Sequence, residues 1–113
     1  MTTIYHNPRC SKSRQCLAIL EDKKEDLQII KYLDTTFSKQ ELTEVIHLLG
    51  IQPIDLVRKN EAIWKQEFKG KDITDQKLVQ IMCEYPKLIE RPIVIKNNKA
   101  IIGRPPEKVI DIL

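Results

Sequence analysis

The spacing of apolar and polar positions predicts a strand, a helix and a second strand in the first third of the chain. Thr3–His6 is a β-branched and aromatic run that stops at an Asn-Pro pair, which is typical of a strand end. Apolar residues then recur at helical spacing, and Ser11 or Ser13 is suitably placed to cap that helix. Leu27–Tyr32 has strand composition. We therefore expect a βαβ unit.

Two helices are predicted in the middle of the chain. Ser38 and Glu41 form a capping-box pattern, followed by apolar residues at helical spacing. Gly50 stands where a helix C-terminus favours glycine. Thr74 begins a second amphipathic segment, which Pro86 ends.

The last third changes to strand periodicity and predicts a β-hairpin and a final helix. Ile93–Lys96 and Lys99–Ile102 flank two asparagines, a pair that tolerates the positive φ of a tight hairpin turn. Pro105 and Pro106 fit the first turn of a terminal helix that runs through Leu113.

These elements together predict an α/β fold. A right-handed βαβ unit joined to a ββα unit gives a four-stranded mixed sheet flanked by helices. This is a thioredoxin-like arrangement with a helical insert in its middle. The length of 113 residues, without a linker, repeat or low-complexity stretch, predicts a single domain over residues 1–113.

Composition excludes several classes of protein. Charged residues make up 31% and hydrophobic residues 42% of the chain, which are ordinary values for a globular protein. The net charge of +3 is too small to favour nucleic-acid binding. There is no apolar run long enough to span a membrane, and the N-terminus does not resemble a signal peptide. We therefore expect a cytoplasmic protein. The chain has three cysteines, and an odd number in a reducing compartment is not expected to form a disulfide framework.

The candidate chemistry lies in the loop between the first predicted strand and helix, residues 6–14. Cys10 is placed at a helix N-terminus, where free N–H groups and the helix dipole favour the thiolate. Arg9, Lys12 and Arg14 add positive charge, and His6 adds more when it is protonated. The same loop is suited to a small oxyanion. The alternative is a buried and inert cysteine at a helix start.

Spacing separates this loop from two other thiol sites. A dithiol oxidoreductase needs Cys-x-x-Cys, but the fourth position is Ser13. A cysteine phosphatase loop needs Cys-x5-Arg, but that position is Cys16. A helix would carry Cys16 about 9 Å from Cys10 at ~1.5 Å per residue, too far for a disulfide. Cys16 and Cys83 are therefore expected to be packing residues. The cysteines and histidines lack metal-ligand spacing, so neither a metal nor another bound cofactor is expected.

Four segments resemble the glutaredoxin-dependent arsenate reductase family. They occur in the family's order across the whole chain: Tyr5–Arg14, Leu56–Asn60, Glu90–Val94 and Ile102–Glu107. The resemblance implies the thioredoxin-like fold. It also implies that Pro92 matches a proline that is often cis in thioredoxin-like proteins.

The resemblance also implies roles for individual residues. Cys10 matches the nucleophile, and His6 matches a histidine implicated in lowering the cysteine's pKa. The arginines Arg58, Arg91 and Arg104 match the family's oxyanion ligands, and Ser13 is placed with them as a substrate-binding residue. An arginine is suited to this role because its planar fork matches a tetrahedral oxyanion.

The function implied is the reduction of arsenate to arsenite, with glutathione as reductant and glutaredoxin as the protein partner. We expect a monomer that binds neither nucleic acid nor a membrane. Ser11 and Lys12 depart from the Gly-Thr usual at these positions, which leaves open a thiol reductase for another oxyanion or for glutathionylated proteins. A different class is an Spx-like redox regulator that binds RNA polymerase. Ser13 breaks the Cys-x-x-Cys switch that such a regulator uses.

Overall fold

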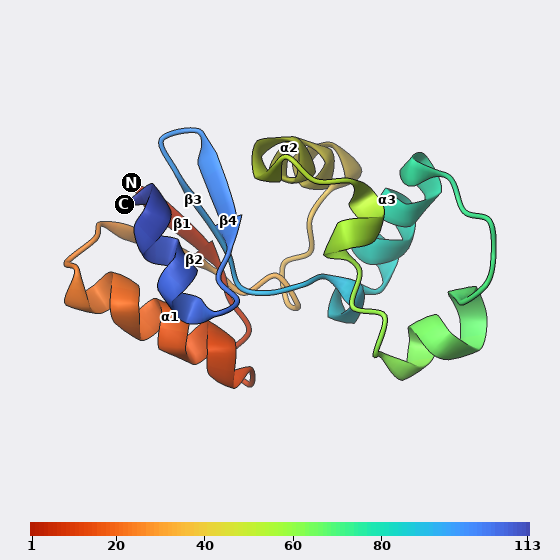
Figure 1. Ribbon diagram of the computed structural model, residues 1–113, viewed down its shortest axis with the longest axis horizontal. Coiled ribbons are helices and arrows are strands. Elements are labelled where there is room, and N and C mark those ends of the chain that lie inside the picture. The colour runs from red at the N-terminus through yellow and green to blue at the C-terminus, as the bar shows by residue number, and fades with distance from the viewer. The chain divides into compact units, whose positions relative to one another are not determined.

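The computed structural model describes residues 1–113, which divide into two compact units. Unit 1 comprises residues 1–35 and 91–113, and unit 2 comprises residues 36–90 (Figure 1). No helix is both long enough and apolar enough to cross a membrane.

Unit 1 is built on a four-stranded mixed sheet with the order β2-β1-β3-β4. Strand β1 (Thr2–Tyr5) runs parallel to β2 (Leu27–Ile30) and antiparallel to β3 (Ile93–Lys96). Strand β3 pairs in turn with the antiparallel β4 (Lys99–Ile102). This topology confirms the predicted thioredoxin-like sheet, in which the two ends of the chain contribute neighbouring strands.

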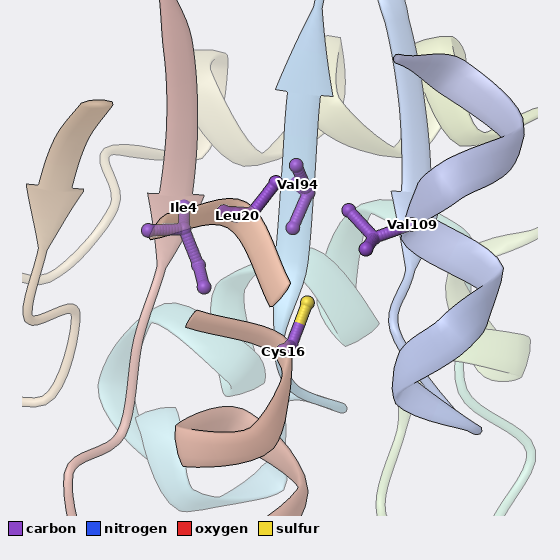
Figure 2. Packing of buried hydrophobic residues seen from close by; sticks show 5 residues of the cluster. All are labelled: Ile4, Cys16, Leu20, Val94 and Val109. Atoms are coloured by element: carbon purple, nitrogen blue, oxygen red, sulfur yellow. The ribbon is translucent and has the colours of Figure 1, made fainter. Parts of the chain in front are cut away.

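The core of unit 1 lies where the helix α1 (Ser11–Asp22) and the C-terminal 3-10 helix η4 (Pro106–Ile112) pack together beside the sheet (Figure 1). Five fully buried side chains converge there from β1, α1, β3 and η4, as Figure 2 shows: Ile4, Cys16, Leu20, Val94 and Val109. Cys16 is therefore part of the hydrophobic core, as the sequence predicted.

The turn between β3 and β4 has the predicted chemistry. Asn97 and Asn98 both have positive φ, at 52° and 61°. Asparagine tolerates this region better than most residues, and two consecutive positive φ values match the twist of a two-residue hairpin. The hairpin places β4, and the residues that follow it, at one edge of the sheet.

Unit 2 contains the predicted helical insert. The helix α2 (Lys39–Leu49) begins with a complete capping box between Ser38 and Glu41. It ends at Gly50, whose φ of 68° is left-handed, so the helix stops where the sequence predicted.

The helix α3 (Asp75–Glu84) packs against α2 within this unit. Thr74 caps α3 by accepting a hydrogen bond from the Lys77 N–H at 3.2 Å. The 3-10 segments η1 (Pro53–Leu56) and η3 (Pro86–Leu88) flank a single π-helical turn, η2 (Trp64–Phe68).

Three local predictions were wrong. Neither Ser11 nor Ser13 caps α1, because the N-cap is Cys10 and Ser13 lies inside the helix. Strand β2 ends at Ile30 rather than Tyr32, because the chain turns after Lys31, whose carbonyl accepts the N–H of Asp34. The terminal helix is 3-10 rather than α-helical.

Two leucines of unit 1 differ in burial, so their substitution tests which residues form its core. Leu20 is fully buried in the cluster, whereas Leu33 keeps 38% of its surface exposed. Leu20→Ala should lower the free energy of unfolding by about 2–5 kcal/mol, because it removes apolar contacts and leaves a cavity. Leu33→Ala should have a much smaller effect. Urea denaturation of both variants measures the difference, and equal losses would contradict the assignment of the core.

Candidate active site

Cys10 lies at the junction of β1 and α1, where it is the N-cap of the helix. Its φ of −93° and ψ of 122° are extended, and its carbonyl accepts the N–H of Arg14 at 3.0 Å. The Cys10 N–H donates to the carbonyl of Asn7, also at 3.0 Å. The backbone on both sides of the cysteine is thus fixed, and the half-buried side chain stands beside the first free N–H groups of α1.

The loop that carries Cys10 is held by two side chains whose roles the sequence reasoning missed. The side-chain carbonyl of Asn7 accepts the N–H of Arg9 at 3.0 Å, which closes an Asx turn. Arg14 Nη1 donates to the carbonyl of Pro8 at 3.0 Å. The Asn-Pro pair signalled a turn as well as a strand end, so the role of Asn7 was within reach of sequence reasoning. The role of Arg14 as a brace for the loop had no sequence signal.

The hydroxyl of Ser13 does not face an open anion site. Ser13 is fully buried, and its Oγ lies 2.6 Å from His6 Nδ1. The same oxygen accepts the main-chain N–H of Asn7 at 3.0 Å. It is the main-chain N–H of Ser13 that acts on Cys10, so any contact of Ser13 with an oxyanion is expected from the backbone rather than from the hydroxyl.

His6 contacts Ser13 and is neutral near pH 7. Burial lowers the pKa of His6 below its ordinary value of 6.5, and the nearby charges of Lys31 and Arg14 lower it further. His6 therefore adds positive charge to the loop only below neutral pH. His6 Nδ1 lies 2.6 Å from the hydroxyl of Ser13, whose main-chain N–H lowers the pKa of Cys10.

The pKa of Cys10 results from opposing effects. Burial alone would raise it, but the N–H of Ser13, the guanidinium of Arg91 and the N–H of Lys12 together bring the pKa below the ordinary value of 9.0. In this structure Cys10 Sγ makes no hydrogen bond that caps the helix. The helix N–H groups favour the ionised sulfur because a thiolate is the better acceptor.

Two arginines from the C-terminal part of unit 1 converge on this cysteine. Arg104 Nη1 lies 3.9 Å from Cys10 Sγ and donates to the carbonyl of Arg91 at 3.3 Å. Arg91 Nε is buried and has no hydrogen-bond partner. An unpaired buried donor requires an acceptor, so this nitrogen is available to a bound oxyanion. Both arginines precede a cis proline, Pro92 and Pro105, of which only Pro92 was expected.

Arg58 belongs to unit 2, where two acidic side chains hold it. Its Nη1 lies 3.1 Å from Glu90 Oε1, and its Nε lies 3.6 Å from Glu61 Oε1. The main chain beside it is fixed by the Arg58 N–H, which donates to the Leu88 carbonyl at 2.7 Å. Its guanidinium is therefore oriented by carboxylates, and its place among the oxyanion ligands stays a prediction.

The other two cysteines differ from Cys10 in their surroundings. Burial raises the pKa of Cys16 to about 11, as expected for a thiol in the hydrophobic core. Burial also raises the pKa of Cys83, on α3. Cys10 is thus the one cysteine of the three whose surroundings favour the reactive form.

Comparison with known proteins agrees with this arrangement. The model of the ArsC family matches residues 5–112. The chain belongs to the ArsC family. A protein named arsenate reductase from Haemophilus influenzae is 43% identical over 97% of this chain and 97% of its own length. The uncharacterized protein YfgD of Escherichia coli is 40% identical over 97% of this chain and 94% of its own length.

Solved structures in the ArsC family have the same fold. The arsenate reductase from Vibrio cholerae superposes with a TM-score of 0.95 and 46% identity, covering 99% of this chain and 97% of that one. The putative arsenate reductase from Yersinia pestis gives 0.94 and 45%, covering 99% and 100%. Both cover the two units described above.

The three cysteines should react in an order set by their pKa values. Cys10 and Cys83 are both half-buried, so they form a matched pair with opposite pKa shifts. With limiting iodoacetamide at pH 7.5, Cys10 should be alkylated first, Cys83 later and the buried Cys16 last. Peptide mass spectrometry measures the order. The rate for Cys10 should rise with pH to a midpoint below 9.0, and a midpoint at or above that value would contradict an activated thiolate.

Proposed function

We propose that this chain reduces arsenate to arsenite through the Cys10 thiolate, with glutathione as reductant and glutaredoxin as the protein that restores the thiol. The observation that carries the proposal is the contact of Arg104 Nη1 with Cys10 Sγ at 3.9 Å, beside the unpaired Nε of Arg91. A thiolate flanked by guanidinium groups, one of which has an unpaired Nε, can bind a tetrahedral oxyanion and attack it. The names of the relatives support arsenate as that oxyanion.

The first chemical step forms a bond between sulfur and arsenic. The Cys10 thiolate attacks As(V), and one arsenate oxygen leaves as water after it takes up protons. Charge that develops on the remaining oxygens is stabilised by Arg91 and Arg104 and by the free N–H groups at the start of α1. We assign a supporting role to Arg58, as a third guanidinium of the oxyanion site.

The second step transfers two electrons. The thiolate of glutathione attacks the Cys10 sulfur of the intermediate, a disulfide bond forms, and the sulfur–arsenic bond breaks. The electron pair of that bond stays on arsenic, which leaves as arsenite in the As(III) state. The two sulfur atoms together lose the two electrons that arsenic gains.

The third step restores the enzyme. A glutaredoxin thiolate attacks the glutathione sulfur of the mixed disulfide and releases Cys10 as a thiolate. We assign this step to an external thiol because Cys16 is buried in the core and burial raises the pKa of Cys83, which disfavours its thiolate. The low pKa of Cys10 also makes it a good leaving group in this exchange.

An assay of arsenite production tests the proposed function. The purified protein should form arsenite repeatedly when arsenate, glutathione and glutaredoxin are all present, and should stop after a single turnover without glutaredoxin. Cys10→Ser should show no turnover, because the attacking sulfur is lost. Cys16→Ala and Cys83→Ala should keep most of the rate.

Two outcomes would contradict the proposal in different ways. If no arsenite forms although Cys10 is alkylated rapidly, the thiol is active but arsenate is not its substrate. If Cys16→Ala or Cys83→Ala folds normally and is inactive, a second cysteine of this chain takes part, and the assignment of the resolving step to glutaredoxin is wrong.

A further inference from the structure

Gly103 lies at a point where the three segments that carry Cys10, Arg91 and Arg104 meet. It follows β4 and directly precedes Arg104, and its N–H donates to the carbonyl of Pro92 at 2.9 Å. A Cβ added to Gly103 would lie 2.9 Å from Cys16 Sγ and 3.0 Å from Pro92 Cγ. No other residue has room at this position without displacing its neighbours.

The reason for glycine here is steric. The φ of Gly103 lies outside the left-handed region that favours glycine, unlike that of Gly50. Any residue could therefore adopt this backbone conformation, and the close approach alone excludes a side chain. A separation below 3.0 Å between these atoms requires something to move.

Neither neighbour of Gly103 can move easily. Cys16 is fixed in the core cluster between α1 and the sheet (Figure 2), and its helix begins at the Cys10 N-cap. Pro92 is a buried ring that follows Arg91 directly. The segment that would give way is the one that leads from β4 to Arg104. Arg104 Nη1 touches both Cys10 Sγ and the Arg91 carbonyl, so a shift of this segment alters both contacts.

We propose that Gly103 is a positioning residue for the reaction. Because it has no side chain, the backbone can pack closely against Cys16 and Pro92, and this close packing allows Arg104 to contact the Cys10 sulfur. In this arrangement the Cys16 sulfur is the atom that a side chain at position 103 would meet first. The inference rests on the proposed function where it concerns turnover, but the placement of Arg104 on Cys10 can be tested without arsenate.

The test compares four variants: Gly103→Ala, Cys16→Ala, the double variant Gly103→Ala/Cys16→Ala, and Val109→Ala. Each is examined for the pH midpoint of Cys10 alkylation, for kcat/KM with arsenate and for thermal unfolding. Val109 is the matched control, because it lies in the same core cluster as Cys16, whereas the three atoms nearest the added Cβ belong to Cys16 and Pro92. It separates a general loss of packing from a displacement of Arg104.

Gly103→Ala should raise the midpoint for Cys10 towards the ordinary 9.0, because it displaces the Arg104 guanidinium that lies 3.9 Å from the sulfur and disturbs its contact with the Arg91 carbonyl. It should lower kcat/KM on the order of 100-fold, as misplacement of a catalytic group by about 1 Å can do. The double variant should recover at least half of the change in midpoint. Without the sulfur, the nearest atom of residue 16 to the added Cβ is its own Cβ, at an ordinary van der Waals distance of 3.6 Å. The contact between the added Cβ and Pro92 Cγ, at 3.0 Å, persists. Cys16→Ala and Val109→Ala should lower thermal stability without moving the midpoint.

The proposal is overturned if Gly103→Ala leaves the midpoint unchanged, or if Val109→Ala moves it equally. It is also overturned if the double variant fails to recover, including by failing to fold. Should Gly103→Ala alone not fold, comparison of the double variant with Cys16→Ala still decides the question. If no variant reduces arsenate but the midpoints follow the expected order, the proposed substrate is wrong and the positioning role stands.

Discussion

The site depends on the stabilisation of a negative charge on a half-buried sulfur. Burial opposes the ionisation of Cys10, and a buried charge without partners is costly. The protein offsets this with N–H groups at the start of α1 and with the guanidinium group of Arg91. Arg104 Nη1 lies 3.9 Å from the same sulfur. The same donors are suited to an oxyanion beside the sulfur. In the proposed reaction, activation of the nucleophile and binding of the oxyanion would therefore use one electrostatic arrangement.

The sheet makes this arrangement possible. Cys10 and Arg104 are separated by 94 positions in the sequence, yet they belong to neighbouring parts of unit 1. Strand β1 leads directly into the cysteine loop, and it pairs with β3, which follows Arg91 in the chain. The β3–β4 hairpin then returns the chain to Gly103 and Arg104. Five buried side chains pack α1 against the same strands (Figure 2). The core that stabilises unit 1 therefore also fixes the helix that begins at Cys10.

Sequence reasoning predicted the parts of the molecule that depend on local chemistry or on apolar spacing. The capping box at Ser38, the left-handed Gly50 and the double-asparagine turn were all identified, because each depends on residues within a few positions of one another. The mixed sheet followed from the handedness of βαβ units. The place of Cys10 at the start of a helix was also predicted, and Cys10 is the N-cap of α1.

Other features depend on distant contacts that a single sequence does not reveal. The hydroxyl of Ser13 is occupied by His6 and Asn7, and His6 is neutral because of burial and of Lys31 across the loop. The need for glycine at position 103 arises from Cys16 and Pro92, which are far from it in sequence. No local pattern marks any of these contacts.

The central claim is that the guanidinium fork at Cys10, and not merely positive charge near it, supports the reaction. The most direct test is kcat/KM for arsenate in Arg104→Lys beside Arg9→Lys. Both changes keep the charge and remove the planar fork, but Arg104 contacts Cys10 Sγ whereas Arg9 is an exposed loop residue. Arg104→Lys should lose about 100-fold, the usual cost of one preorganised donor. Arg9→Lys should stay within about twofold, as surface substitutions do. Equal effects of the two changes would contradict the claim.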